Sequence, residues 1–158
     1  MSKVICPFSG DPITFGHIDI IERAAHTFDT VIAAIGINPL KEYLFSIEER
    51  FQMAKEALQH LPNVQVESYE GLLADFAKAK GADVVIRGLR NAVDFNYEWM
   101  IYQINESIDE KLETIWMPCR KEKESISSSA VKNLWKHGKS ISGMVPEVVI
   151  KRMPFVTR

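Results

Sequence analysis

Short runs of apolar residues, rich in valine and isoleucine, recur along the 158-residue chain at intervals that leave room for a helix between them. They lie at residues 4–6, 30–37, 64–69, 84–87 and 114–117. The runs are nearly continuous rather than alternating, which is typical of strands that are covered on both faces. The pattern therefore predicts five strands in a parallel sheet.

The segments between these runs carry the period of an α-helix. One begins at His17, a second begins at the capping-box sequence of residues 46–49 and continues to about residue 59, and a third ends at Gly81. The apolar positions are Ile18, Ile21, Ala25 and Phe28 in the first helix and Leu72, Phe76 and Ala79 in the third. Repeated strand-helix-strand units with right-handed crossovers predict an α/β fold, a Rossmann-like doubly wound sheet in a single domain over residues 1–158.

Composition and charge argue against several classes of protein. The chain carries 19 Lys and Arg against 21 Asp and Glu, whereas a dedicated nucleic-acid binder would have a basic excess, so we expect no nucleic-acid partner. No run of 18 apolar residues exists, so we expect no membrane span. Cys6 and Cys119 have no metal-ligand spacing, so we expect reduced thiols in a cytoplasmic protein and no metal held by the chain itself.

Residues suited to chemistry follow four of the predicted strands. Ser9 and His17 follow the first, residues 38–41 the second, residues 87–90 the fourth and residues 127–129 the fifth. In open α/β sheets, ligands bind beyond the carboxyl ends of the strands. The topology therefore predicts that these residues, which are scattered in the sequence, converge on one site.

The three serines at residues 127–129 stand directly before a helical pattern at residues 130–134. Hydroxyls and free backbone N–H groups at a helix N-terminus bind phosphate. Serine is also a common N-cap, and a plain cap needs only one serine. The triplet is therefore consistent with a phosphate site or with an ordinary helix start.

Three cationic residues are candidates for contacts with an anion. Arg87 and Arg90 flank Gly88 immediately after a buried strand, where two unpaired guanidinium groups would suit phosphate. The alternative is salt bridges, for which the nearby carboxylates are Asp83, Asp94 and Glu98. Lys41 by itself has the pattern of an ordinary solvated lysine.

His17 stands in the first turn of a predicted helix. The positive end of the helix dipole disfavours the imidazolium ion and favours a neutral ring. A neutral ring still donates one hydrogen bond to a phosphate oxygen, so His17 would be an orienting and charge-stabilising group and need not shuttle protons. A structural role for this histidine is the alternative.

Several well-known machineries lack their signatures in this chain. There is no G-x-x-x-x-G-K-[ST] loop, no G-x-G-x-x-G after the first strand, no H-E-x-x-H and no G-x-S-x-G. The remaining inventory indicates a phosphate site without a covalent nucleophile.

Two short motifs resemble those of a known superfamily. TFGH at residues 14–17 resembles the (H/T)-x-G-H signature of the nucleotidyltransferases, and SISSSAVK at residues 125–132 resembles their I-S-S-S/T element. The segments DPITFGHIDII, IRGLR followed by DFNYE, and MP before the serines are together similar to bacterial phosphopantetheine adenylyltransferases. The resemblance runs over nearly the whole chain in the family's order and spacing.

The resemblance implies a reversible transfer of an adenylyl group from ATP to 4′-phosphopantetheine, giving dephospho-coenzyme A and pyrophosphate. The acceptor phosphate would attack the ATP α-phosphate directly and in line. Because the attacking group is already an anion, no general base is needed, and catalysis rests on positioning and charge stabilisation. The resemblance further implies Mg²⁺ carried by the ATP phosphates, a homohexamer and feedback inhibition by coenzyme A.

The resemblance also implies roles for individual residues. The implied catalytic residues are His17, which contacts the α-phosphate, Lys41 and Arg90. The implied phosphopantetheine contacts are Ser9, Lys41, Leu73, Arg87 and Asn105. The implied ATP contacts are Ser9, Gly10, His17, Gly88, Leu89, Arg90, Glu98, Lys123, Glu124, Ser125, Ile126, Ser127, Ser128 and Ser129.

One loop departs from the family pattern. The family usually reads Y-P-G-T-F-D-P, whereas residues 6–12 of this chain read CPFSGDP, so the glycine and the aromatic residue have changed places. We expect Ser9 to keep the role of the family's threonine in a slightly remodelled loop. The loop at residues 121–125 also lacks the aromatic residue that is common before the family's serine element.

Other interpretations remain beside this one. A cytidylyltransferase or a nicotinamide-mononucleotide adenylyltransferase would share the fold and His17, although Thr14 and the IRGLR and DFNYE segments favour the phosphopantetheine enzyme. A non-catalytic nucleotide-binding regulator on the same sheet predicts ATP binding without release of pyrophosphate.

Overall fold

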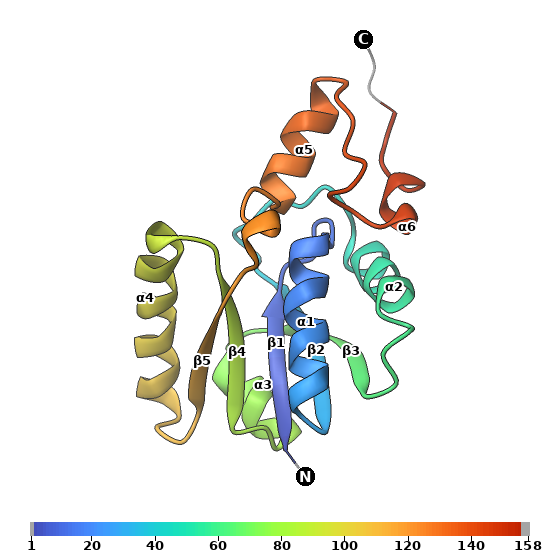
Figure 1. Ribbon diagram of the computed structural model, residues 1–158. Coiled ribbons are helices and arrows are strands. Elements are labelled where there is room, and N and C mark those ends of the chain that lie inside the picture. Colours follow the sequence, from blue (N-terminus) through green and yellow to red (C-terminus); the bar gives the residue numbers. More distant parts are fainter. Residues whose placement is uncertain (1, 156–158) are drawn as a thin grey trace.

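A five-stranded parallel sheet forms the centre of the computed structural model, which describes residues 2–155 (Figure 1). Its strands are β1 (Lys3–Phe8), β2 (Thr30–Ile37), β3 (Val64–Glu70), β4 (Val84–Leu89) and β5 (Glu113–Pro118). They lie side by side in the order β3-β2-β1-β4-β5, and every neighbouring pair is parallel. The five predicted strands and the doubly wound arrangement are confirmed.

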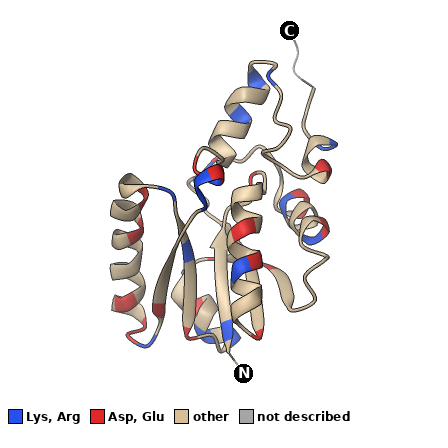
Figure 2. Cartoon of the chain, in the orientation of Figure 1, with Lys and Arg blue, Asp and Glu red and all other residues tan. Residues whose placement is uncertain are grey.

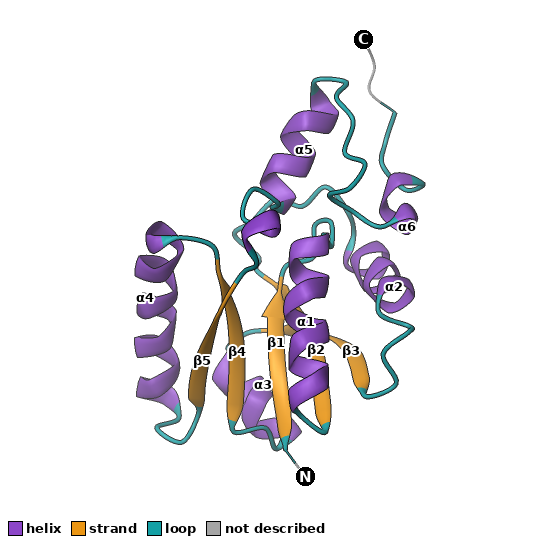
Figure 3. Cartoon of the chain, in the orientation of Figure 1, coloured by secondary structure: helices purple, strands orange, loops and turns teal. Residues whose placement is uncertain are grey.

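Helices connect the strands (Figure 3). They are α1 (Phe15–Thr27), α2 (Ile47–Ala57), α3 (Leu73–Lys80), α4 (Ala92–Ile108), α5 (Ser128–Lys136) and α6 (Glu147–Ile150), with a 3-10 turn at Lys121–Lys123. Within residues 2–155, none of these helices is long and apolar enough to cross a membrane.

Successive residues of the central strands pack on opposite faces of the sheet, as parallel strands buried on both sides require. Val4 and Cys6 of β1 belong to one apolar cluster, together with residues of α1, α2, α5 and α6. Ile5, which lies between them, belongs to a second cluster formed with α3. The sheet is therefore the middle of three layers, with α1 in front of it and α3 behind it in Figure 1.

Local signals for the ends of helices were read correctly from the sequence. The Ser46 hydroxyl accepts a hydrogen bond from the Glu49 N–H, and the Glu49 carboxylate accepts one from the Ser46 N–H, so the predicted capping box starts α2. Gly81 ends α3 with a φ of 62°, a left-handed conformation that glycine adopts without steric cost.

The predicted buried face of α3 is correct for Phe76, which packs against the core, but wrong for Leu72 and Ala79. Leu72 is 51% exposed and Ala79 is also exposed, whereas Leu73, Ala74 and Ala77 are buried. The buried stripe is shifted because three small or medium side chains pack closely against the sheet. The larger Leu72 stands just before the helix, at its N-cap.

No helix was predicted from periodicity over residues 92–108, where α4 forms the longest helix. Its apolar side chains do not lie on one buried stripe: Tyr97, Trp99 and Met100 are 45% to 56% exposed. Trp99 also contacts Trp116 of β5, with ring centroids 5.9 Å apart. The buried residues of α4 are the polar Glu98 and Asn105, and none of its apolar residues is buried, so α4 lacks the simple pattern that identifies a surface helix.

The strands β1 and β4 separate toward their carboxyl ends. β1 pairs with β2 along its whole length, from Lys3 to Phe8, but it pairs with β4 only at Val4 and Ile5. The order of the strands reverses between β1 and β4, because the chain first adds strands on the β2 side and then on the β4 side. Ligand crevices of open α/β sheets lie at this kind of switch point.

Candidate active site

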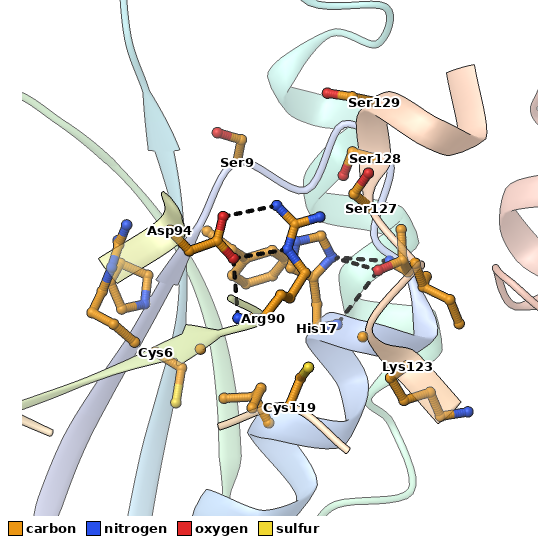
Figure 4. Close-up of a pocket in the computed structure, with 18 of the residues that line it drawn as sticks. Cys6, Ser9, His17, Arg90, Asp94, Cys119, Lys123, Ser127, Ser128 and Ser129 are labelled. Atoms are coloured by element: carbon orange, nitrogen blue, oxygen red, sulfur yellow. Dashed lines mark hydrogen bonds and ion pairs between the residues drawn. The ribbon is translucent and has the colours of Figure 1, made fainter. Parts of the chain in front are cut away.

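A cavity of about 380 Å³ lies beyond the carboxyl ends of β1 and β4, below the start of α5 (Figure 4). The loops that follow four strands contribute to its lining, as the topology predicted. The residues implied by the resemblance that line it are Ser9, His17, Lys41, Arg87, Gly88, Arg90, Glu98, Lys123, Ile126, Ser127, Ser128 and Ser129. Residues from distant parts of the chain therefore converge on one site.

Six of the implied binding residues do not line this cavity. Leu73 is a core residue of α3 that packs in the cluster containing Ile5, and Asn105 is buried in α4 with 4% of its surface exposed. The other four are Gly10, Leu89, Glu124 and Ser125, which are sequence neighbours of lining residues. Their roles in binding stay predictions.

The T-x-G-H sequence is a capping box that starts α1. Thr14 is the N-cap, and its hydroxyl accepts a hydrogen bond from the His17 N–H at 3.5 Å. The Thr14 N–H donates to Nδ1 of His17 at 3.1 Å. Because an N-cap and the third helical residue face each other across the first turn, the spacing of the motif places the imidazole at the helix entrance.

This capping contact also determines the tautomer of His17. A backbone N–H only donates, so Nδ1 must accept and the ring proton lies on Nε2. Burial, and then the positive charge of Arg90, lower the pKa of His17 from its ordinary 6.5 to about 4. At neutral pH the ring is therefore uncharged and presents one N–H donor, as the sequence predicted.

The rearranged loop after β1 places an aromatic ring beside this histidine. The ring of Phe8 packs against the ring of His17, with centroids 5.2 Å apart. Gly10 has a φ of 62°, and a Cβ there would lie only 3.0 Å from the Phe8 ring. Glycine is therefore required at position 10 for its backbone conformation and for the space that Phe8 occupies.

Arg87 near the end of β4 and Arg90 just after it form ion pairs with carboxylates of α4. Nε and Nη2 of Arg87 donate to Glu98 at 2.6 and 2.8 Å, and the same atoms of Arg90 donate to Asp94 at 3.0 and 3.1 Å. The side-on geometry orients each guanidinium and leaves its Nη1 group outside the pair. Salt bridging and a place in the cavity therefore occur together in Arg87 and Arg90. Figure 4 shows Arg90 with its partner Asp94.

The three serines before α5 have different local roles. Ser127 is the N-cap, and its hydroxyl accepts a hydrogen bond from the Ala130 N–H at 3.0 Å. The Ser128 hydroxyl donates to the Pro12 carbonyl at 2.8 Å and thereby holds the start of α5 to the loop after β1. Ser129 also lines the cavity. Ser127 alone serves as the N-cap, which is all that an ordinary helix start needs, and all three serines also line the cavity.

The lining has an excess of positive charge. Its five basic residues are Lys41, Arg87, Arg90, Lys123 and Lys132, and its three acidic residues are Asp11, Asp94 and Glu98. Each of the three carboxylates is paired with an arginine or lysine of the same lining. Within residues 2–155, Lys41 and Lys123 form no ion pair, so the cavity is suited to a polyanion. Figure 2 shows the basic residues of the 3-10 turn and of α5 above the sheet.

Sequence reasoning missed Asp11 and Lys132, an ion pair that holds together the segments around the cavity. Asp11 is 1% exposed and accepts hydrogen bonds from the Leu44 and Phe45 N–H groups and from Nζ of Lys132 at 2.9 Å. This carboxylate joins the loop after β1 to the loop after β2 and to α5. The available signals were an acidic residue next to a proline in a turn and a lysine one helical turn after Ser128.

The titration of His17 predicts how stability depends on pH. Between about pH 6.5 and pH 4 the unfolded chain binds a proton at this residue and the folded chain does not, so stability falls as the pH decreases through this range. From pH 7 to pH 5, the wild type should lose about 2 kcal/mol more unfolding free energy than His17→Gln, a change that retains a capping-box side chain.

Urea titrations of both proteins at several pH values measure this difference. Equal losses in the two proteins would contradict a His17 that stays neutral in the folded protein.

Comparisons with known proteins agree with this geometry. A family model described as cytidylyltransferase-like matches residues 9–134. A solved structure from Vibrio parahaemolyticus, provisionally described as a nicotinate-nucleotide adenylyltransferase, superimposes with a TM-score of 0.71. It is 23% identical and covers 95% of this chain and 91% of its own. At this identity, the likeness shows the fold.

Curated relatives are more similar in sequence. A phosphopantetheine adenylyltransferase from Symbiobacterium thermophilum is 46% identical, covering 97% of this chain and 94% of its own length. Relatives of the same name from Carboxydothermus hydrogenoformans and Clostridium kluyveri are 47% and 43% identical, covering 94% and 95% of this chain and 92% of each relative. With its cytidylyltransferase-like fold and its T-x-G-H capping box, this chain belongs to the phosphopantetheine adenylyltransferase family.

Proposed function

We infer that this protein is an enzyme that transfers the adenylyl group of ATP to 4′-phosphopantetheine, giving dephospho-coenzyme A and pyrophosphate. The observation that carries this function is the likeness to three relatives named for it, each over more than nine-tenths of the chain. The cytidylyltransferase-like match and the cationic cavity support the same reaction class.

The reaction needs one bond to form while another breaks. An oxygen of the acceptor phosphate attacks the α-phosphorus of ATP, and the bond from that phosphorus to the β-phosphate oxygen breaks, so pyrophosphate leaves with its electron pair. The attacking oxygen is already anionic, so no proton has to be removed. The protein's contribution is then alignment of the two substrates and stabilisation of the charge on the α-phosphate oxygens.

We assign the second of these tasks to His17. Its Nδ1 is held by Thr14, so its Nε2–H is a fixed donor for an oxygen of the α-phosphate. A preorganised donor of this kind stabilises the transition state without reorienting during the reaction. Arg90, whose charge lowers the pKa of His17, supplies a permanent positive charge beside it.

We divide the remaining lining residues between the two substrates. We assign the acceptor phosphate to Ser9, Lys41 and Arg87, because Lys41 Nζ donates to Ser9 Oγ at 3.4 Å and forms a paired donor group with it. The ATP phosphates are assigned to Arg90, Lys123 and the serines at the start of α5. A helix N-terminus with free N–H groups suits the triphosphate.

Magnesium would enter with ATP rather than bind to a cage of protein ligands. Within residues 2–155, no group of three His, Cys, Asp or Glu side chains is placed to hold a metal ion. The carboxylates Asp94 and Glu98 in the cavity are already paired with arginines. This donor set fits Mg²⁺ held by the nucleotide phosphates and water, where it would offset charge on the leaving pyrophosphate.

We also propose that the enzyme assembles as a homohexamer. The exposed face of α4 supports an association surface, because Tyr97, Trp99 and Met100 are 45% to 56% exposed. Large apolar patches of this kind are uncommon on monomers. Sedimentation equilibrium at micromolar concentration should give a mass close to six chains, and a monomer mass would exclude the hexamer.

Feedback and location complete the proposal. Coenzyme A contains the phosphopantetheine group of the product, so we propose that it competes for the acceptor side of the cavity. Adding coenzyme A to the rate assay tests this competition.

The free cysteines Cys6 and Cys119 are consistent with a cytoplasmic location, where thiols stay reduced.

The direct test of function measures pyrophosphate release by purified protein with ATP, Mg²⁺ and 4′-phosphopantetheine, with mass detection of the product. CTP in place of ATP and nicotinamide mononucleotide in place of the acceptor are the parallel controls. We expect dephospho-coenzyme A to form only from ATP and 4′-phosphopantetheine. Binding of ATP without turnover of any acceptor would favour the regulator interpretation instead.

The role of His17 is tested by His17→Ala. Because one preorganised donor at the α-phosphate is lost, we expect kcat to fall by about 10³-fold or more, while circular dichroism still shows the folded protein. His26→Ala is the matched control, because His26 lies exposed on the same helix and outside the cavity. A His17→Ala enzyme within about threefold of wild-type turnover would remove His17 from the mechanism.

A further inference from the structure

Arg50 of α2 is a buried guanidinium directly behind the cavity. It is 2% exposed and is the largest of the fully buried side chains within residues 2–155. Its Nη1 donates to the Ser9 carbonyl at 2.7 Å and to the Gly36 carbonyl at 3.1 Å. Its guanidinium carbon lies 3.8 Å from the centre of the Tyr43 ring, a stacking distance.

Simple packing does not explain this residue. Burial of a charge is costly unless it is paired and hydrogen-bonded, and an apolar side chain of similar volume is often as stable or more so. Within residues 2–155, no carboxylate forms an ion pair with Arg50, and its Nε has no hydrogen-bond partner. The contacts of the guanidinium are two backbone carbonyls and the face of an aromatic ring. We therefore look for the role of Arg50 in the segments that these contacts connect.

The contacts of Arg50 connect two loops that carry site residues. The carbonyl of Ser9 belongs to the loop after β1, and the carbonyl of Gly36 belongs to the end of β2. A single nitrogen donates to both, so it ties the Ser9 peptide to the end of β2 just beyond the last pair of the two strands, Phe8 with Ile35. The Ser9 hydroxyl on the first loop lines the cavity.

The stacking contact extends this control to Lys41. The hydroxyl of Tyr43 accepts a hydrogen bond from the Asn38 N–H at 3.0 Å, and the Asn38 carbonyl accepts one from the Lys41 N–H at 3.0 Å. Lys41 Nζ in turn donates to Ser9 Oγ. Arg50 is thus connected to Ser9 in two ways: directly through the Ser9 carbonyl, and indirectly through Tyr43, Asn38 and Lys41.

We propose that Arg50 is a positioning residue that holds Ser9 and Lys41 at the spacing required to bind the acceptor phosphate. Arg50 itself does not line the cavity, so it acts through these two residues. The inference rests on the proposed function for the identity of the acceptor. The geometry of the two loops is independent of that function and can be measured separately.

Steady-state kinetics of Arg50→Met and Arg50→Lys test the positioning role. Methionine keeps much of the side-chain volume and removes the donors. We expect Arg50→Met to raise KM for 4′-phosphopantetheine about tenfold or more, as for the loss of hydrogen bonds to a charged donor, with a much smaller change in KM for ATP. Lysine keeps the charge but not the planar set of donors, so Arg50→Lys should also raise KM for 4′-phosphopantetheine, by a smaller factor than Arg50→Met.

Arg152→Met is the matched control. Arg152 also donates to a backbone carbonyl, that of Val148 at 3.4 Å, and pairs with Glu56 of α2, but it does not line the cavity. We expect both KM values of this variant to stay at wild-type levels. If Arg50→Met and Arg50→Lys lowered only the amount of folded protein and left the acceptor KM unchanged, Arg50 would be structural and the proposal would be overturned.

Hydrogen exchange provides a second readout that needs no turnover. In Arg50→Lys, and in Arg50→Met where it folds, the amides of Asn38 and Lys41 should exchange about tenfold faster, because the Tyr43 contact that orders them is weakened. Amides of β5 are the internal reference. Unchanged exchange at Asn38 and Lys41 would overturn the positioning role.

The two readouts separate failure of this inference from failure of the proposed function. A wild-type enzyme that does not turn over 4′-phosphopantetheine would contradict the function, and the exchange experiment would then decide the role of Arg50 alone. A wild type that is active, with an acceptor KM that is insensitive to Arg50, would contradict the inference and leave the function intact.

Discussion

The separation of β1 from β4 is the constraint on which the site depends. These neighbouring strands pair at Val4 and Ile5 and then diverge, while β1 continues to pair with β2 as far as Phe8. The divergence occurs where the order of the strands reverses, so no crossover helix fills the gap at the carboxyl ends. The cavity occupies this gap, and the loops after β1 and β4 therefore face each other across it.

Electrostatics then determines what the gap can hold. The three carboxylates of the lining are each occupied by a cation of the same lining, which orients Arg87, Arg90 and Lys132. Lys41 and Lys123 add positive charge that no ion pair within residues 2–155 offsets. A cavity with fixed donors and surplus positive charge favours the charge distribution of a phosphoryl or nucleotidyl transition state over a neutral substrate.

One local motif links the start of a helix to the chemistry. The Thr14 to His17 capping box satisfies backbone groups at the start of α1, and the same contact fixes the proton of His17 on Nε2. The contact that starts α1 therefore also orients the donor that the proposed mechanism uses. Behind the site, Arg50 and Asp11 hold the loops in place from buried positions, Asp11 with a paired charge and Arg50 with carbonyl groups.

The sequence by itself determined the five strands, the parallel doubly wound sheet and the convergence of Ser9, His17, Lys41 and the serines of residues 127–129. These features follow from local patterns, because runs of buried residues and the turns after them are written in adjacent positions. Only the tertiary structure decided that α4 lies against β5 with most of its apolar residues exposed and that Leu73 is a core residue rather than a cavity residue. It alone also assigned Arg50 and Asp11 to their places behind the loops. Each of these depends on contacts between residues far apart in the chain, and no local periodicity records which distant partner will face a side chain.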